Sequence, residues 1–300
     1  MTALQQRALA RQLGASALAY AALTKPRIIE LLLITTVPTM IVAQRGWPGT
    51  WLVAATVGGG ALAAGAANAF NCALETDIDT VMERTSDRPL PNGRVTPARA
   101  RRFAAGLAVL AVAGLAALVN PLAAGLAAFA ILFYVVVYTL GLKRRTTQNI
   151  VIGGAAGCMP VVIGWAAVTG GIDVPALVLF GIVFAWTPPH FWALALRYRE
   201  DYARAGVPML PVVVGDQETA KHILLYGVLM VAVTLMFGPV GQMGAIYLVA
   251  ALALGGWFLW HAAALWRHVT QQRAMRVFHA SIAYLALLFV AMAVDAIALS

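Results

Sequence analysis

A series of acidic and amide side chains, spaced four residues apart, follows an apolar run: Asn71, Glu75, Asp79 and Glu83. If the helix continues, these four lie along one face, where like charges repel. A cation would offset that repulsion, and hard oxygen ligands suit Mg²⁺, which commonly retains substrate phosphate oxygens. Arg84 and Arg88 permit another interpretation, a solvated acidic helix end neutralised by bases. We favour the metal site, because polar groups at the end of a membrane span are usually functional.

A second polar segment, 197–211, supplies Asp201 as a further candidate metal ligand. Arg197 and Arg204 flank this aspartate at positions that equally permit a structural ion pair. The bases at 143–145 resemble a positive-inside anchor, and Lys143 and Arg144 could also grip a diphosphate.

Five histidines fall in the same half of the predicted topology: His190, His222, His261, His268 and His279. Such a group could hold a haem iron or relay protons, although a single histidine is usually a satisfied hydrogen-bonding residue. His190 follows Pro188 and Pro189, which interrupt the backbone hydrogen bonds of a span. This interruption therefore predicts that the segment around His190 forms a pocket wall.

The elements that position these residues are predicted to be membrane helices. The 300 residues are 61% hydrophobic and 11% charged, which excludes an ordinary water-soluble enzyme and a disordered chain. Cys72 and Cys158 lie in or beside apolar runs and are expected to be buried rather than bridged. The sequence predicts an all-α polytopic bundle with nine transmembrane helices near 28–44, 51–74, 103–119, 121–141, 149–168, 174–197, 221–238, 242–265 and 278–299.

The basic residues predict the orientation of these helices. All Lys and Arg residues except Arg45 fall in the N-terminal segment or in alternate loops, which places the N-terminus in the cytoplasm and the C-terminus outside. Most carboxylates fall in two of the same inner loops, near 75–102 and 197–220, so the active site is expected to face the cytoplasm. The net charge of +9 is then a consequence of topology and lipid contact, and nucleic-acid binding is not expected.

We divide the chain into a cytoplasmic segment, 1–27, and one transmembrane domain, 28–300. The segment carries bases and no acid, which predicts an interfacial helix, with a short transit peptide as the alternative. Its brevity favours a bacterial inner membrane over a mitochondrial one.

Several motifs resemble the UbiA superfamily of intramembrane prenyltransferases. The run from Asn71 to Asp79 is similar to its N-x-x-x-D-x-x-x-D signature, with Glu75 in place of the usual Asp. The order of further motifs resembles the branch that farnesylates haem: Asp77-Ile78-Asp79, Met82-Glu83-Arg84-Thr85, Arg88-Pro89-Leu90, Lys143-Arg144 with Thr146 and Asn149, Pro189-His190-Phe191, and Asp201-Tyr202 with Gly206 and Pro208. Ala205 replaces the second aspartate of the superfamily's second motif, so a symmetric second metal site is not expected.

The resemblance implies a central cavity that opens to lipid and cytoplasm, with farnesyl diphosphate and haem B as substrates and haem O as product. It implies Mg²⁺ as cofactor, bound by Asn71, Glu75, Asp79 and Asp201. Glu83, Lys143 and Arg144 join the metal ligands in the expected catalytic group. The expected substrate-binding residues are Arg84, Arg88, Asn149, His190, Tyr202 and His279. A haem A synthase or terminal oxidase is an expected protein partner.

Two alternatives remain open at this point. One is a UbiA-type enzyme that prenylates an aromatic quinone precursor. The other is a transporter, which typically has ionisable residues facing each other at the bilayer midplane. Only Glu30 and Asp295 lie within predicted spans away from the acidic loops, so the transporter is the weaker alternative.

Overall fold

The computed structural model describes residues 16–300, except for the side chains of 27–33. Residues 16–23 are helical, whereas the rest of the predicted interfacial helix lies outside the described residues. The long helices are α2 (Pro26–Gln44), α3 (Thr50–Leu74), α5 (Pro97–Leu118), α6 (Pro121–Leu132), α7 (Asn149–Thr169), α8 (Val174–Arg197), α11 (Asp216–Val240), α12 (Ala245–Arg267) and α13 (Gln271–Ala298). The short elements are α4 (Thr76–Val81), η1 (Glu83–Thr85), α9 (Arg199–Arg204) and α10 (Leu210–Val214), and a π-helix, η2 (Phe133–Leu142), continues α6.

Eight of the described helices are long and apolar enough to cross a bilayer, and α2 contributes the shorter apolar helix Ile34–Gln44. The prediction of an all-helical, multi-pass membrane protein is confirmed. Several helices begin earlier than predicted, because their first turns are polar and capped. Thr96 accepts a hydrogen bond from the Arg99 amide at the start of α5, and Thr270 accepts one from the Arg273 amide at the start of α13.

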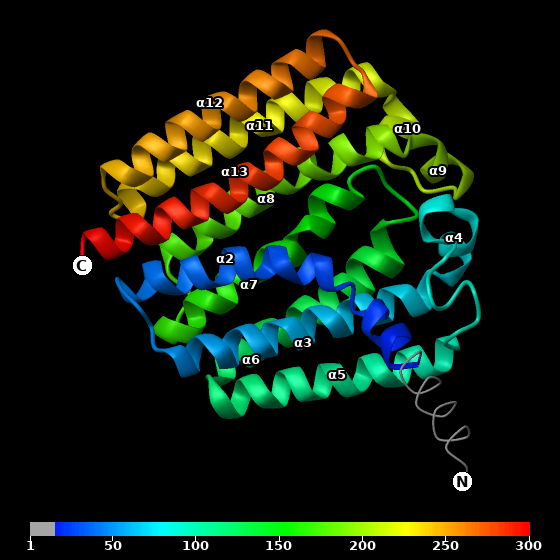
Figure 1. Ribbon diagram of the computed structural model, residues 1–300, viewed down its shortest axis with the longest axis horizontal. Helices are drawn as coiled ribbons and strands as arrows, with labels where there is room; N and C mark the ends of the chain where they lie inside the picture. The colour runs from blue at the N-terminus through cyan, green and yellow to red at the C-terminus, as the bar shows by residue number, and fades with distance from the viewer. Residues whose placement is uncertain (1–15) are drawn as a thin grey trace, which may run out of the picture.

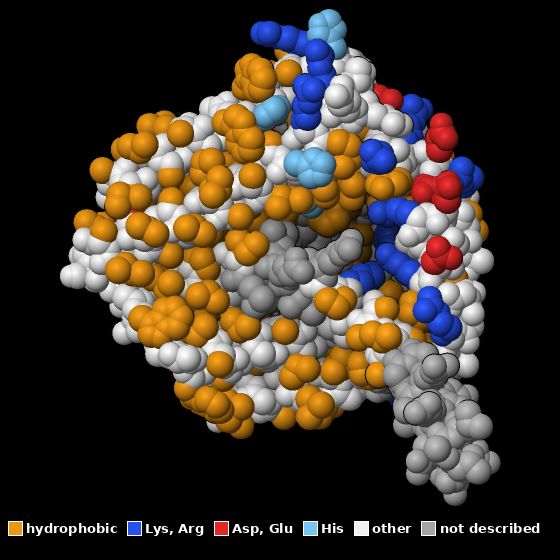
Figure 2. Space-filling view, viewed as in Figure 1, with side chains coloured by type: hydrophobic (Ala, Val, Ile, Leu, Met, Phe, Trp, Pro, Cys, Tyr) orange, Lys and Arg blue, Asp and Glu red, His pale blue; other side chains and the backbone are white. Residues whose placement is uncertain are grey.

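The short helices α4, α9 and α10 lie together at one end of the bundle, which we call the charged end (Figure 1). The C-terminus lies at the opposite end. Lys, Arg, Asp and Glu side chains gather over the charged end, and apolar side chains cover most of the remaining visible surface (Figure 2). This division matches a protein whose helix sides contact lipid and whose polar loops lie at one membrane surface.

Helix α8 contacts α7, α11 and α13, and these four helices form the larger group of packed helices. Helix α3 packs mainly against α5. Small residues allow the close approaches. A Cβ atom added to Gly154 of α7 would lie 2.8 Å from Thr187 Cγ2 of α8, so only glycine permits this contact without a shift. Packing of this kind replaces the hydrophobic driving force that is absent between helices in lipid.

The predicted fourth span is an α-helix only in its first half. From Phe133 to Leu142 it has π-helical hydrogen bonding, in which the Lys143 amide donates to the Tyr138 carbonyl. The wider turns change which side chains face α3, and they direct Thr139 and Lys143 toward the end of that helix. Segments of π-helix frequently occur at functional sites.

Candidate active site

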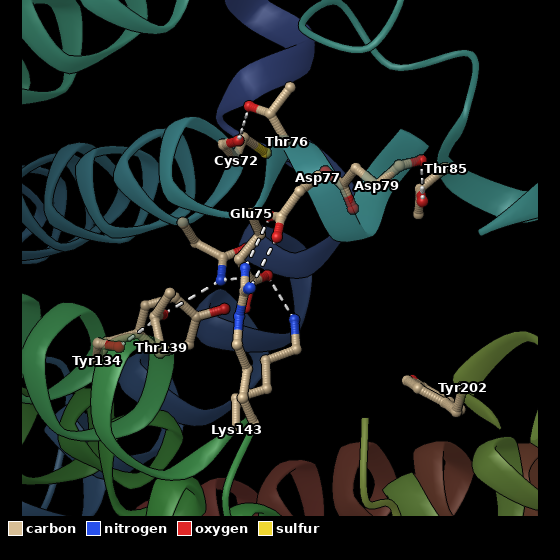
Figure 3. A network of polar contacts seen from close by, with 12 residues as sticks. Cys72, Glu75, Thr76, Asp77, Asp79, Thr85, Tyr134, Thr139, Lys143 and Tyr202 are labelled. Atoms are coloured by element: carbon tan, nitrogen blue, oxygen red, sulfur yellow. Dashed lines mark hydrogen bonds and ion pairs between the residues drawn. The ribbon is translucent and has the colours of Figure 1, made fainter. Parts of the chain in front are cut away.

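A buried polar network joins the end of α3 to the π-helix. The Asn71 amide nitrogen donates to Glu75 Oε2 at 2.8 Å and to Thr139 Oγ1 at 3.2 Å. Lys143 Nζ forms an ion pair with the same Glu75 oxygen. Figure 3 shows Lys143 extending toward Glu75, with Thr139 beside the contact. The ends of α3 and of the π-helix therefore hold one carboxylate in a fixed position.

The other oxygen of Glu75 is available to a ligand. Glu75 is 1% exposed, and its Oε1 atom is buried without a hydrogen-bond partner in the described structure. An unpartnered buried carboxylate oxygen is costly in a low-dielectric environment. A divalent cation accompanied by water or phosphate oxygens would satisfy this atom, so the residues present fit the predicted metal.

The two aspartates after Glu75 have different surroundings. Asp77 is exposed and forms a two-point contact with Arg144, with both distances 2.7 Å. This hydrogen-bonded contact lowers the pKa of Asp77 and raises the pKa of Arg144. Asp79 is buried, and one guanidinium nitrogen of Arg88 contacts both of its oxygens at 2.8 and 2.9 Å. Asp79 therefore belongs to the buried face and Asp77 to the surface.

The prediction that Asn71, Glu75, Asp79 and Glu83 lie along one helix face is wrong at Glu83. Backbone hydrogen bonds carry the helical course from Asn71 through Glu75 to Asp79. Met82 is extended, with φ −80° and ψ 125°, and it ends α4 before Glu83. The Glu83 side chain is consequently 89% exposed, and its catalytic role stays a prediction.

The second polar loop lies beside the first. Asp201 is buried and ion-paired with Arg204. Arg84 donates to the Tyr202 hydroxyl at 2.6 Å, and its guanidinium lies 5.2 Å from the Tyr198 ring centre. An open pocket of about 510 Å³ is lined by residues of both loops, including Glu83, Arg84 and Asp201. The tertiary structure thus brings together two polar loops that are over 100 residues apart in the sequence.

No three His, Cys, Asp or Glu side chains converge on a possible metal position within the part of the chain that the structure describes. Each buried carboxylate of the two loops instead contacts a base: Glu75 contacts Lys143, Asp79 contacts Arg88, and Asp201 contacts Arg204. These bases offset the charge that the sequence pattern assigned to a metal. The four-residue ligand set stays a prediction, and Glu75 has the strongest structural support.

The remaining predicted residues lie at different depths. Asn149 begins α7, and its buried Oδ1 has no partner in the described structure. The His190 Nδ1 atom lies 2.7 Å from Ser281 Oγ, with the ring between Trp186 and Phe278 at centre distances of 4.3 and 4.7 Å. His279 is exposed and lines a separate pocket.

Sequence reasoning missed two members of the network. Lys25 Nζ donates to Asn71 Oδ1 at 3.0 Å, although the sequence indicated only a topology anchor for this residue. Burial lowers its pKa, and its φ of 52° is left-handed. The sequence indication for Lys25 was the proline, Pro26, that follows it. Thr139 had no signal, because sequence periodicity does not predict a π-helix.

Comparison with known proteins identifies similar sequences along most of the chain. The model of the UbiA prenyltransferase family matches residues 32–292. The protoheme IX farnesyltransferase of Leifsonia xyli subsp. xyli is 55% identical over 281 residues, which cover 92% of this chain and 91% of that protein. Protoheme IX farnesyltransferase 1 of Saccharopolyspora erythraea is 58% identical over 280 residues, with 92% and 89% covered.

Solved structures have the same fold at low sequence identity. A digeranylgeranylglyceryl phosphate synthase aligns with a TM-score of 0.78 and 19% identity, covering 95% of this chain and 99% of that one. A UbiA homolog from Archaeoglobus fulgidus bound to DMAPP and Mg²⁺ aligns with a TM-score of 0.68 and 16% identity, with 94% and 99% covered.

Proposed function

The chain belongs to the UbiA prenyltransferase family, and from this premise we propose that it farnesylates protohaem IX. The reaction joins C1 of farnesyl diphosphate to a vinyl group of haem B, releases diphosphate and adds water, giving haem O. The observation that carries the proposal is identity above 50%, over about nine-tenths of the chain, to relatives named protoheme IX farnesyltransferase. The rival acceptor, an aromatic quinone precursor, has no comparable support.

The buried network is suited to receive an allylic diphosphate. Lys143 and Lys25 place two ammonium groups beside Asn71 and Glu75, so anionic oxygens that enter this network meet nearby positive charge. Charge of this kind stabilises the diphosphate as the carbon–oxygen bond breaks. Arg144 lies at the same end of the π-helix and can add a further contact when its pair with Asp77 opens.

We assign Mg²⁺ as the cofactor, held by Glu75 together with Asn71 and Asp79, with Asp201 as a contributor from the second loop. When bound, the ion supplies Lewis-acid neutralisation of the diphosphate. The unpartnered Oε1 of Glu75 supports this assignment. The Archaeoglobus fulgidus homolog of the same fold, which is bound to both DMAPP and Mg²⁺, gives further support.

The acceptor must react with a carbocation before water does. Apolar helices and the bilayer limit water around the farnesyl chain. His190 is buried between two aromatic rings, and we assign it a positioning role toward the acceptor. Water then captures the second cation, after the new carbon–carbon bond has formed at the vinyl group.

The bases at the charged end indicate how the protein is oriented. We propose that this end faces the cytoplasm of a bacterium, with the protein in the inner membrane, because inserted helices retain Lys and Arg on that side. A haem A synthase or terminal oxidase is the proposed consumer of the product.

The proposal is tested by incubating the purified protein in nanodiscs with haem B, farnesyl diphosphate and Mg²⁺, and by analysing the haem by mass spectrometry. We expect a farnesylated, hydrated haem that is absent when EDTA is present. Asp79→Ala should lower turnover at least 100-fold, that is by about 2.7 kcal/mol or more of transition-state stabilisation, without loss of the folded protein. A product from hydroxybenzoate but not from haem would refute the proposal.

A further inference from the structure

A second open pocket lies next to the 510 Å³ pocket at the charged end. Its volume is about 610 Å³, and it is lined by Arg197, Gln271, Gln272, Met275, Arg276 and His279. Arg197 and Gln271 also line the first pocket, so the two pockets adjoin. We call the second one the α8–α13 pocket, after the two helices that supply its lining.

The two pockets differ in charge. The first contains four carboxylates, from Glu83, Glu200, Asp201 and Asp216, whereas no acidic side chain lines the α8–α13 pocket among the described residues. None of the ion pairs in the described part of the chain involves Arg197 or Arg276. The first pocket is therefore suited to an anion bridged by a cation, and the second to an anion that contacts arginine directly.

The neighbouring Arg273 differs from Arg276 in its contacts. Arg273 donates to the carbonyls of Ala264 and His268 at 3.1 Å each, and it thereby caps the end of α12. Arg276, three residues later on α13, is exposed at the pocket and caps no helix within the described structure. The fixed fork of a guanidinium matches a carboxylate with two parallel hydrogen bonds. Two such forks fit a ligand that carries two carboxylates.

The surroundings of the pocket favour a flat, amphipathic ligand. Arg197 ends α8 and Arg276 lies in the second turn of α13, so both lie where spans meet the membrane surface. Phe278 lies 5.4 Å from the His279 ring and 4.7 Å from the His190 ring, measured between centres. Aromatic rings thus continue from the pocket into the bundle, where an apolar macrocycle would be shielded from water.

We infer that Arg197 and Arg276 bind the two propionate groups of the haem acceptor. This inference rests on the proposed function, because haem carries both carboxylates on one edge and both vinyl groups on the rest of the ring. Binding of the carboxylates at the membrane surface directs the vinyl-bearing part into the bundle. The α8–α13 pocket therefore selects and orients the acceptor, while the Glu75 network binds the donor.

The test compares haem B with its dimethyl ester, in which both carboxylates are blocked. Binding to the protein in nanodiscs is followed by the Soret absorbance for the wild type, for Arg197→Ala/Arg276→Ala, and for Arg102→Ala, which removes an exposed charge on another helix. We expect the wild type to prefer haem B by at least about tenfold, as charge-assisted hydrogen bonds predict. The double variant should lose that preference, and Arg102→Ala should retain it.

In the double variant, the Michaelis constant for farnesyl diphosphate should change less than about twofold. This result would place the loss at the acceptor side. Equal affinity of the wild type for haem and its ester would overturn the inference without any variant. Unchanged haem affinity in the double variant would overturn it as well. A wild type that makes no farnesylated haem would instead refute the proposed function on which the inference rests.

Discussion

The charged side chains around the end of α3 can bind a ligand only as a group. Glu75 is buried and contacts Lys143, while one of its oxygens has no partner in the described structure. Lys25 approaches the same group from the N-terminal side of α2 through Asn71. Two ammonium groups next to one carboxylate leave an excess of positive charge. That excess favours a diphosphate over a neutral ligand.

Replacement of Lys25 tests this account. Lys25→Ala removes a charge-assisted hydrogen bond, which is worth about 1.5–3 kcal/mol, and should lower kcat/KM for farnesyl diphosphate by roughly ten- to hundredfold. The left-handed backbone of Lys25 makes Lys25→Gly the matched control, because glycine adopts that conformation without strain. Both variants should lose activity equally. Recovery of activity in the glycine variant alone would assign the effect to the backbone.

Some contacts join helices of the bundle at the end opposite the candidate active site. Asp295, a buried carboxylate of α13, accepts hydrogen bonds from the amides of Gly244 and Tyr247 at the start of α12, at 2.5 and 3.2 Å. It therefore caps a neighbouring helix. This contact gives a structural reason for one of the two ionisable residues on which the transporter alternative depended.

Asp295→Ala should destabilise the protein by about 1–3 kcal/mol, because two amides at the start of α12 lose a buried acceptor. Thermal unfolding in detergent measures the effect. Asp295→Asn keeps one acceptor oxygen and should lie between the wild type and Asp295→Ala, with turnover per folded molecule unchanged in both variants. Lost turnover at an unchanged melting temperature would indicate a functional acid instead.

One glycine of α7, Gly154, allows a close approach to α8. Gly154→Ala would place a methyl group 2.8 Å from Thr187 Cγ2, and overpacking of this kind costs about 1–3 kcal/mol. Gly157→Ala on the same helix is the matched control, since nothing lies within 4 Å of its added Cβ. The first variant should melt at a lower temperature than the wild type, and the second should not. Equal melting temperatures would show that α8 shifts without cost.

At the scale of the whole molecule, polar loops and both open pockets lie at the charged end, while apolar helix sides form most of the visible surface (Figure 2). The donor and acceptor sites that we propose thus share one membrane surface. An amphipathic donor and an amphipathic acceptor can both keep their anionic groups in water and their apolar parts in lipid. The reaction then takes place where the two apolar parts meet.

The proposed orientation is tested by cysteine labelling in intact bacterial cells. Both native cysteines are buried, so Ser300→Cys and Asp87→Cys introduce exposed thiols at the two ends of the bundle. A membrane-impermeant maleimide should label the Ser300→Cys variant in intact cells and the Asp87→Cys variant only after lysis. The reverse pattern would contradict a cytoplasmic charged end.

The sequence by itself determined the helical class, the approximate number and positions of the spans, and the loops that carry the polar residues. These properties follow from local patterns, because a span needs about 20 apolar residues wherever it occurs. It also placed Asn71, Glu75 and Asp79 on one helix face, since a spacing of four residues is a helical property.

Only the tertiary structure decided which side chains meet. Lys25 contacts Asn71 and Lys143 contacts Glu75 across separations of 46 and 68 residues, and no spacing rule spans such intervals. The break at Met82, which exposes Glu83, and the π-helix that directs Thr139 depend on packing between helices. The pairing of each buried carboxylate with a base was likewise undetermined, because the same charges permit a metal or an ion pair until their distances are known.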